Sequence, residues 1–168
     1  MSISNNKRKT AYLLIYLISV IIGTIVIHEF AHFVAALALG VPINEIEVGF
    51  IGKNPGVTIP DRFINAPLGI FHYSGGFFTA LVLIFVYFLI WYRKFRIHPS
   101  FFNWAYGAIT ILFVGLQLGQ GYLEGKFHAA YMFYAGSVFS VTSIFTWGVC
   151  AFVVCFHFLF FPIPKTKK

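Results

Sequence analysis

Long apolar runs separated by short polar segments make up most of this chain. The four runs cover Ala11–Leu39, Ala66–Tyr92, Phe101–Leu123 and Phe127–Phe161. A helix of about 20 apolar residues is long enough to cross the hydrocarbon core of a bilayer. The pattern therefore predicts an all-α membrane protein with about four transmembrane helices over these ranges. The last run is longer than one straight span requires, and we expect a break near Gly136.

The longest polar stretch lies between the first two runs and follows a different pattern. It begins at Gly40 and contains "PINEIEVGF", in which apolar and polar residues alternate around Val48. The tripeptide Asn54-Pro55-Gly56, a turn signal, follows. Alternation with a period of two before a turn is typical of a hairpin. We therefore expect a short β-hairpin-like loop at the membrane surface after the first helix.

The composition agrees with lipid as the solvent of these helices. The chain is 59% hydrophobic and 10% charged, whereas soluble domains carry about 25% charged residues. A water-soluble core built from 168 residues could not bury so much apolar surface. The length suggests one compact bundle, and we expect a single domain over residues 1–168.

The basic residues lie at the ends of the apolar runs and predict an orientation. Nine of them fall on one side and three on the other. The nine are Lys7, Arg8, Lys9, Arg93, Lys94, Arg96, Lys165, Lys167 and Lys168, and the three are Lys53, Arg62 and Lys126. The positive-inside rule then places both termini in the cytoplasm. Because these anchors explain the net charge of +7, we expect no nucleic-acid partner.

The first run contains the motif H-E-x-x-H, as His28-Glu29-Phe30-Ala31-His32. On a helix, residues i and i+4 lie on one face, so two imidazoles can hold one zinc ion. The glutamate between them can take a proton from a water molecule that the metal activates. A hydrogen-bonded polar cluster between helices is the structural alternative. That alternative leaves an acid inside a span without a metal partner, which is costly.

A catalytic zinc ion needs a third protein ligand, and the chain offers few candidates. Glu124 follows the third apolar run, and His128 lies four residues later. Counted from the cytoplasmic side, His28 and Glu124 reach depths within roughly two helical turns of each other. Either Glu124 or His128 can therefore complete the site. His72, near the start of the second run on the same side, is a candidate for contact with substrate or with a developing oxyanion.

The segment "HEFAHFVAALALGVPINEIEVGF" resembles the site-2 protease family of intramembrane zinc metalloproteases. The family's third ligand is an aspartate in an L-D-G element, and Leu123-Glu124-Gly125 looks like it with glutamate in place of aspartate. The family's G-x-x-x-[NSG] element is similar to "YSGGFFTAL", with Gly75 and Thr79 in the key places. The resemblance covers most of the chain and implies Glu124, not His128, as the third zinc ligand.

The resemblance implies a protease that cleaves membrane-protein substrates in or near a transmembrane segment within the bilayer. His28, His32 and Glu124 would hold zinc, and Glu29 would be the general base. The hairpin near Val48 would hold an unwound substrate strand by edge pairing. Contact with substrate would also involve Gly75, Gly76 and Thr79. The family places its site nearer the cytoplasm, whereas the basic residues here place it nearer the outer face, so its depth stays open.

Two other functions fit the same residues. An inactive relative would bind or regulate a membrane partner, although such a relative would usually have lost Glu29 or a ligand. A metal carrier would use the same histidines, but it needs a relay of ligands through the bilayer. The cytoplasmic half of the runs contains no such polar chain. An enzyme therefore agrees best with the sequence.

Overall fold

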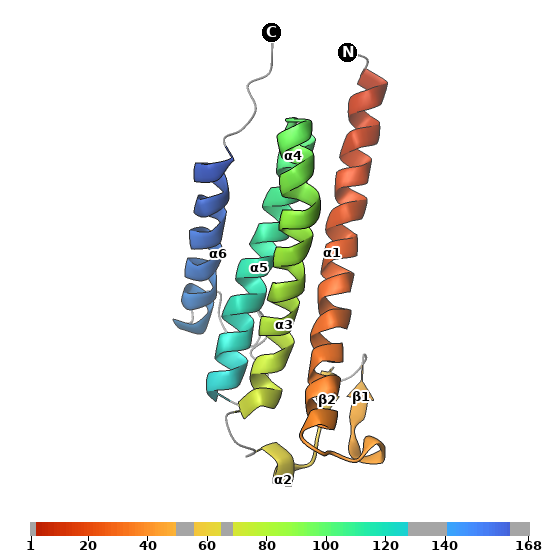
Figure 1. The fold of residues 1–168 in the computed structure, drawn as a ribbon, viewed down its shortest axis with the longest axis vertical. Helices are drawn as coiled ribbons and strands as arrows, with labels where there is room; N and C mark the ends of the chain where they lie inside the picture. Colours follow the sequence, from red (N-terminus) through yellow and green to blue (C-terminus); the bar gives the residue numbers. More distant parts are fainter. Residues whose placement is uncertain (1–2, 50–55, 65–68, 128–140, 162–168) are drawn as a thin grey trace.

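Four helices stand side by side in the computed structural model, which describes residues 3–49, 56–64, 69–127 and 141–161. They are α1 (Ile3–Ala38), α3 (Ile70–Val86), α5 (Phe101–Phe127) and α6 (Val141–Phe160). α3 packs against both α1 and α5, and α6 packs against α5. Figure 1 shows this order across the bundle, with α1 and α6 at its two sides. The predicted all-α membrane fold is confirmed.

Three helices of the described chain are long and apolar enough to cross a membrane. They cover Lys7–Ala38, Ile70–Ile97 and Phe101–Lys126, and α6 is a shorter apolar helix over Ile144–Phe160. Side chains on the outer face of α1, such as Ile22 and Ile25, are more than half exposed, as expected where lipid covers the bundle. The expected break near Gly136 lies outside the described residues.

Several helices extend beyond the apolar runs that predict them. α1 begins at Ile3 rather than Ala11, and α5 continues past Leu123 to Phe127. The second helix starts at Ile70 and continues as a π-helical segment, η3 (Tyr87–Tyr92), and a last turn, α4 (Arg93–Ile97). Polar residues at the ends of a span keep helical hydrogen bonds, so hydropathy alone underestimates helix length.

The predicted hairpin after the first helix is confirmed. β1 (Glu47–Gly49) and β2 (Gly56–Thr58) pair antiparallel, with Val48 opposite Val57. A 3-10 turn, η1 (Ile43–Glu45), precedes them and the short helix α2 (Asp61–Ile64) follows. An ion pair between Glu45 and Arg62 joins these two turns.

A small apolar core fixes the hairpin against the end of α1. It contains Ala35, Ala36, Val41, Val57, Ile59 and Phe71. The hairpin, α2 and the first turns of α3 thus lie at one end of the bundle, opposite the start of α1 and opposite α4 (Figure 1). The basic residues of α1 and α4 share that opposite end, as the charge pattern predicts.

Close packing of α3 against α5 depends on two glycines. A Cβ on Gly76 would collide with the backbone of Gly121, and a Cβ on Gly121 would lie 2.9 Å from Gly76 Cα. Small residues at such positions let membrane helices approach closely. This contact brings the first half of α3 and the last two turns of α5 against each other.

Candidate metal centre

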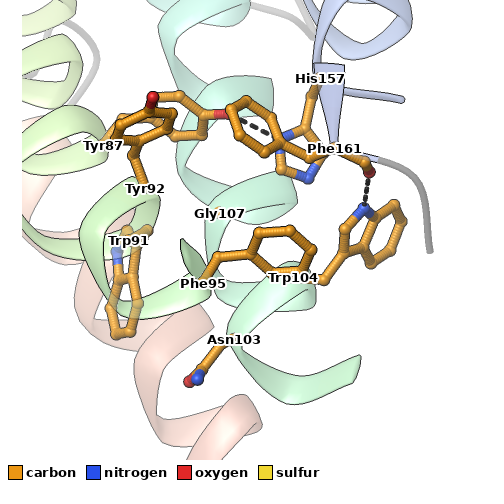
Figure 2. A pocket seen from close by; sticks show the side chains of 9 residues that line it. All are labelled: Tyr87, Trp91, Tyr92, Phe95, Asn103, Trp104, Gly107, His157 and Phe161. Atoms are coloured by element: carbon orange, nitrogen blue, oxygen red, sulfur yellow. Dashed lines mark hydrogen bonds between the residues drawn. The ribbon is translucent and has the colours of Figure 1, made fainter. Parts of the chain in front are cut away.

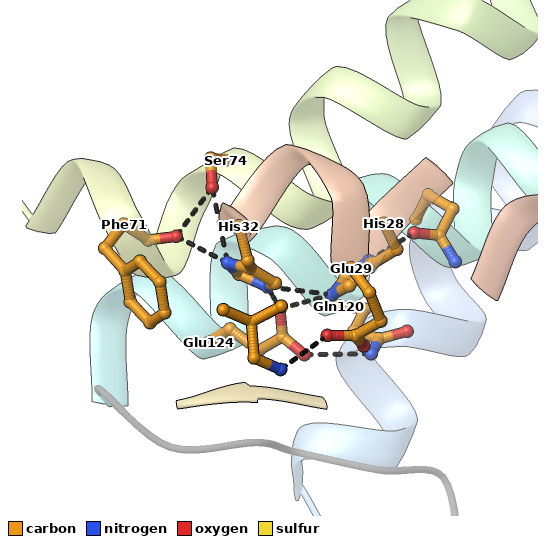
Figure 3. Close-up of polar contacts among 9 residues, drawn as sticks. His28, Glu29, His32, Phe71, Ser74, Gln120 and Glu124 are labelled. Atoms are coloured by element: carbon orange, nitrogen blue, oxygen red, sulfur yellow. Dashed lines mark hydrogen bonds and ion pairs between the residues drawn. The ribbon is translucent and has the colours of Figure 1, made fainter. Parts of the chain in front are cut away.

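Three side chains that the sequence singles out meet between α1 and α5 (Figure 3). His28 and His32 lie one turn apart on α1, and their Nε2 atoms are 3.1 Å apart. Glu124 Oε2 on α5 lies 3.2 Å from His28 Nε2 and 3.7 Å from His32 Nε2. All three residues are buried. This buried group could hold a metal ion.

The far nitrogen of each imidazole faces an oxygen atom. Nδ1 of His28 lies 2.8 Å from Gln117 Oε1, and Nδ1 of His32 lies 2.7 Å from the carbonyl oxygen of Phe71. Each Nδ1 can therefore donate its hydrogen to an acceptor on a neighbouring helix. Such a bond leaves the Nε2 lone pair directed inward, which is the tautomer that metal-ligating histidines use.

A hydrogen bond from a neighbouring side chain also orients Glu124. Gln120, one turn earlier on α5, donates from Nε2 to Glu124 Oε1 at 2.9 Å. This bond leaves Oε2 for the two imidazoles, and Oε2 is buried without a hydrogen bond. Three electron-pair donors thus face one another, a repulsive arrangement unless a cation or proton lies between them. A metal ion would satisfy all three donors at once.

Gly75 on α3 leaves room beside the histidines. A Cβ at this position would collide with Nε2 of both His28 and His32. Gly75 is also buried within the bundle. The absence of a side chain here lets both imidazoles pack against the backbone of α3.

Glu29 lies on α1 next to His28 but faces the hairpin. Its Oε2 accepts a hydrogen bond of 3.0 Å from the backbone N–H of Val57 in β2. Gly56, with φ of 140°, also lies against this carboxylate, because a Cβ there would be 3.2 Å from Oε2. The hairpin thus contacts the motif through its backbone.

The other predicted site residues have different surroundings. Val48 on β1 is 47% exposed, and His72 lies in the first turn of α3 with its ring centroid 5.2 Å from that of Phe71. Thr79 is fully buried and Gly76 faces α5, so both lie within the helix packing. His128 lies outside the described residues. Contact of these residues with substrate stays a prediction.

Sequence reasoning missed the residues that hold the ligands in place. Gln117, Gln120 and Glu124 occupy positions i, i+3 and i+7 of one apolar helix, which places them on one face. That spacing was the available signal, because amides are uncommon on an apolar span. Ser74, whose hydroxyl donates to the Phe71 carbonyl oxygen at 2.7 Å, gave no comparable pattern.

A second polar group lies at the opposite end of the bundle, in a small aromatic pocket (Figure 2). Its lining residues are Tyr87, Trp91, Tyr92, Phe95, Asn103, Trp104, Gly107, His157 and Phe161. His157 Nδ1 lies 2.8 Å from the Tyr87 hydroxyl. Trp104 donates from Nε1 to the carbonyl oxygen of Phe161 at 2.7 Å. These bonds join α6 to η3 and α5, so the group serves helix packing.

Comparison with known proteins adds no relative to this picture. No protein-family model matches the chain, and no curated protein or solved structure matches it. The resemblance to the site-2 protease family therefore rests on the motifs quoted above and on nothing beyond them.

Proposed function

We propose that the protein is an intramembrane zinc metalloprotease that hydrolyses peptide bonds in or near transmembrane segments. The observation that carries the proposal is the convergence of His28 Nε2, His32 Nε2 and Glu124 Oε2 beside Glu29. Zinc binds imidazole nitrogen and carboxylate oxygen at about 2.0–2.2 Å, so tetrahedral ligands stand roughly 3.4 Å apart. The three donor separations of 3.1, 3.2 and 3.7 Å agree with that value.

The roles of the residues follow from their chemistry. A bound zinc ion would act as a Lewis acid and make a water molecule more acidic. Glu29 would accept a proton from that water and later deliver it to the leaving amine. Gln117 and the Phe71 carbonyl would fix the imidazole tautomers, while Gln120 would orient Glu124. These hydrogen bonds are already formed in the protein.

The substrate would be a membrane protein, because the centre lies between helices that are long and apolar enough to span a bilayer. Its helix must unwind locally to expose a backbone carbonyl. The hairpin can pair with such an extended segment through a strand edge. His72 would stabilise developing negative charge.

Metal content and cleavage test the proposal together. Protein purified in detergent should carry about one zinc ion per chain by elemental analysis. It should cleave a model transmembrane substrate until a chelator such as phenanthroline is added. Glu29→Gln should keep the zinc and lose cleavage by at least about 100-fold, because glutamine cannot accept the proton.

The control for this variant is Glu47→Gln, which changes an exposed acid of β1 and should leave both readouts unchanged. Full cleavage by Glu29→Gln, or active protein without a transition metal, would contradict the proposal. Bound zinc without cleavage by the wild-type protein would favour an inactive relative. Zinc uptake into proteoliposomes without cleavage would favour a metal carrier.

A further inference from the structure

The edge of β2 that faces α1 is not open in this structure. Val57 donates its backbone N–H to Glu29 Oε2, so that group points away from β1. In an antiparallel pair, opposite residues exchange two hydrogen bonds or none. Val48 and Val57 are opposite each other, so they form a pair without mutual hydrogen bonds. The N–H of Val57 therefore belongs to the outer edge of the hairpin.

A peptide that adds to this edge needs the same N–H. An added strand pairs through main-chain hydrogen bonds, and its carbonyl oxygen would require the donor that Glu29 now occupies. One N–H makes one well-aligned hydrogen bond. Glu29 and an incoming strand consequently compete for Val57.

The backbone of β2 is shaped to admit the carboxylate of Glu29. Gly56 has φ of 140°, in a region that glycine adopts readily and other residues rarely do. A Cβ there would meet Glu29 Oε2 at 3.2 Å. The side chain of Val57 packs in the core with Ala35 and Phe71, so the strand is held beside α1. The contact therefore involves a fixed strand rather than a loose surface loop.

We propose that the contact between Glu29 and Val57 is a latch that closes the outer edge of β2 until an extended peptide replaces Glu29 there. The same exchange releases the carboxylate from the hairpin, so that arrival of the strand frees the general base. This inference rests on the proposed function and adds how the site couples binding to chemistry. In the resting protein the base is engaged by β2, which limits hydrolysis in the absence of a bound strand.

Amide hydrogen exchange tests the latch without metal or cleavage. The full chain, labelled with 15N-valine in detergent micelles with chelator, allows exchange at single valines to be followed by NMR. Glu29→Ala should speed exchange at Val57 by about tenfold or more, because a charge-assisted hydrogen bond is lost. Glu29→Gln should stay closer to wild type, since its amide oxygen can still accept.

Two other valines serve as internal references. Val48 lies on β1, and Val41 donates to the Ala36 carbonyl oxygen, so neither contacts Glu29 through its amide. Their exchange should change less than about twofold in Glu29→Ala. Equal acceleration at all three valines, or none at Val57, would overturn the latch.

Peptide binding tests the competition. The probe is a fluorescent heptapeptide of alternating valine and threonine, measured by fluorescence polarisation with chelator present. Glu29→Ala should bind it roughly five- to tenfold more tightly than wild type, because the competing acceptor is gone. Glu47→Ala should bind like wild type. A peptide N-methylated at alternate residues should bind neither protein, because it cannot pair with a strand.

Equal or weaker binding by Glu29→Ala would overturn the proposal, and so would a probe that binds neither protein. Both arms are run without metal and without hydrolysis. A failure of zinc binding or of cleavage would therefore reject the proposed function while leaving the outcome of these two arms intact.

Discussion

At the scale of single residues, three donor atoms converge because the other polar atoms of the same side chains are already engaged. Gln117 and the Phe71 carbonyl face the outer imidazole nitrogens, and Gln120 donates to Glu124 Oε1. Each bond fixes the direction of a side chain as well as its hydrogen. The geometry of the centre therefore depends on amides and carbonyls as much as on the motif.

Glu124 should prove essential to metal binding. Gln120→Leu removes only the hydrogen bond that orients Glu124, and it should weaken zinc binding about 10–100-fold. Glu124→Ala removes the proposed ligand itself and should lower the zinc affinity further, while Glu124→Asp should keep part of the affinity. Zinc titration of each variant measures this, with Lys126→Ala at the exposed end of α5 as the control. Zinc binding that survives Glu124→Ala and collapses in His128→Ala would assign the third ligand to His128.

Gly75→Ala should block the centre sterically. The added methyl group would overlap Nε2 of His28 and His32, so zinc occupancy and cleavage should both fall by tenfold or more, roughly as for loss of an outer partner. Gly148→Ala is the matched control, because a Cβ at Gly148 meets nothing within 4 Å. Equal zinc occupancy in the two variants would mean that α3 lies farther from the histidines than the structure places it.

At the scale of elements, the apolar runs were sufficient to predict the helices and alternation was sufficient to predict the hairpin. The helix ends were harder to predict, because "GYLEGKF" contains two charged residues and two glycines, a composition that indicates the boundary of a span. It remains helical in α5, where Gly125 packs against the Tyr73 ring. Packing against a neighbour therefore decides the boundary, and a single sequence does not reveal that neighbour.

The candidate site shows the same difference between residues that a local pattern predicts and residues that depend on packing between distant segments. His28, Glu29 and His32 could be predicted because helical spacing alone brings them together. Glu124 needed a matching depth on another helix, which the apolar runs supplied. The contact between Glu29 and Val57 joins residues 28 positions apart, and it depends on the fold of the hairpin. No local pattern predicts such a contact.

The contact between α3 and α5 should be sensitive to side-chain size. Gly121→Val would push α5 away from Gly76 and shift Glu124, which lies one turn later. We expect a loss of about 1–3 kcal/mol in stability from overpacking and weaker zinc binding. Thermal unfolding in micelles, followed by tryptophan fluorescence, measures the first effect. Gly23→Val, at a position where an added Cβ would meet nothing within 4 Å, should behave like wild type. Equal melting of both variants would contradict the packing argument.

At the scale of the whole molecule, the basic residues of α1 and α4 lie at the opposite end of the bundle from the candidate metal centre. The basic residues near the start of α1 and in α4 share one end of the bundle, and the hairpin lies at the other (Figure 1). The candidate metal centre lies toward the hairpin end, because Glu29, next to His28, contacts β2. The positive-inside rule predicts that the basic end faces the cytoplasm. The centre would then lie nearer the outer face of the membrane.

Labelling in intact cells tests this orientation. Single cysteines are introduced at Ser4, Asn44 and Thr166 in a chain whose Cys150 and Cys155 are replaced by alanine. A membrane-impermeant maleimide should label Asn44→Cys and should leave Ser4→Cys and Thr166→Cys unlabelled until the cells are opened. Labelling at both termini would reverse the orientation and bring the centre to the cytoplasmic side, as in the family that the motifs resemble.

Of the three long apolar helices, α1 is the least buried within the bundle, and it carries two of the three candidate ligands. Within the most apolar 18 residues of each span, 11% are buried in α1 and 44% in α5. A metal ion joining His28 and His32 to Glu124 would add a cross-link between α1 and α5 at the end of α1 that already packs in the bundle. Packing of α1 against the bundle and binding of the metal ion are then thermodynamically linked, so that each favours the other. The ion would thus stabilise the packing of α1 as well as take part in catalysis. Its removal would loosen α1 before the other helices.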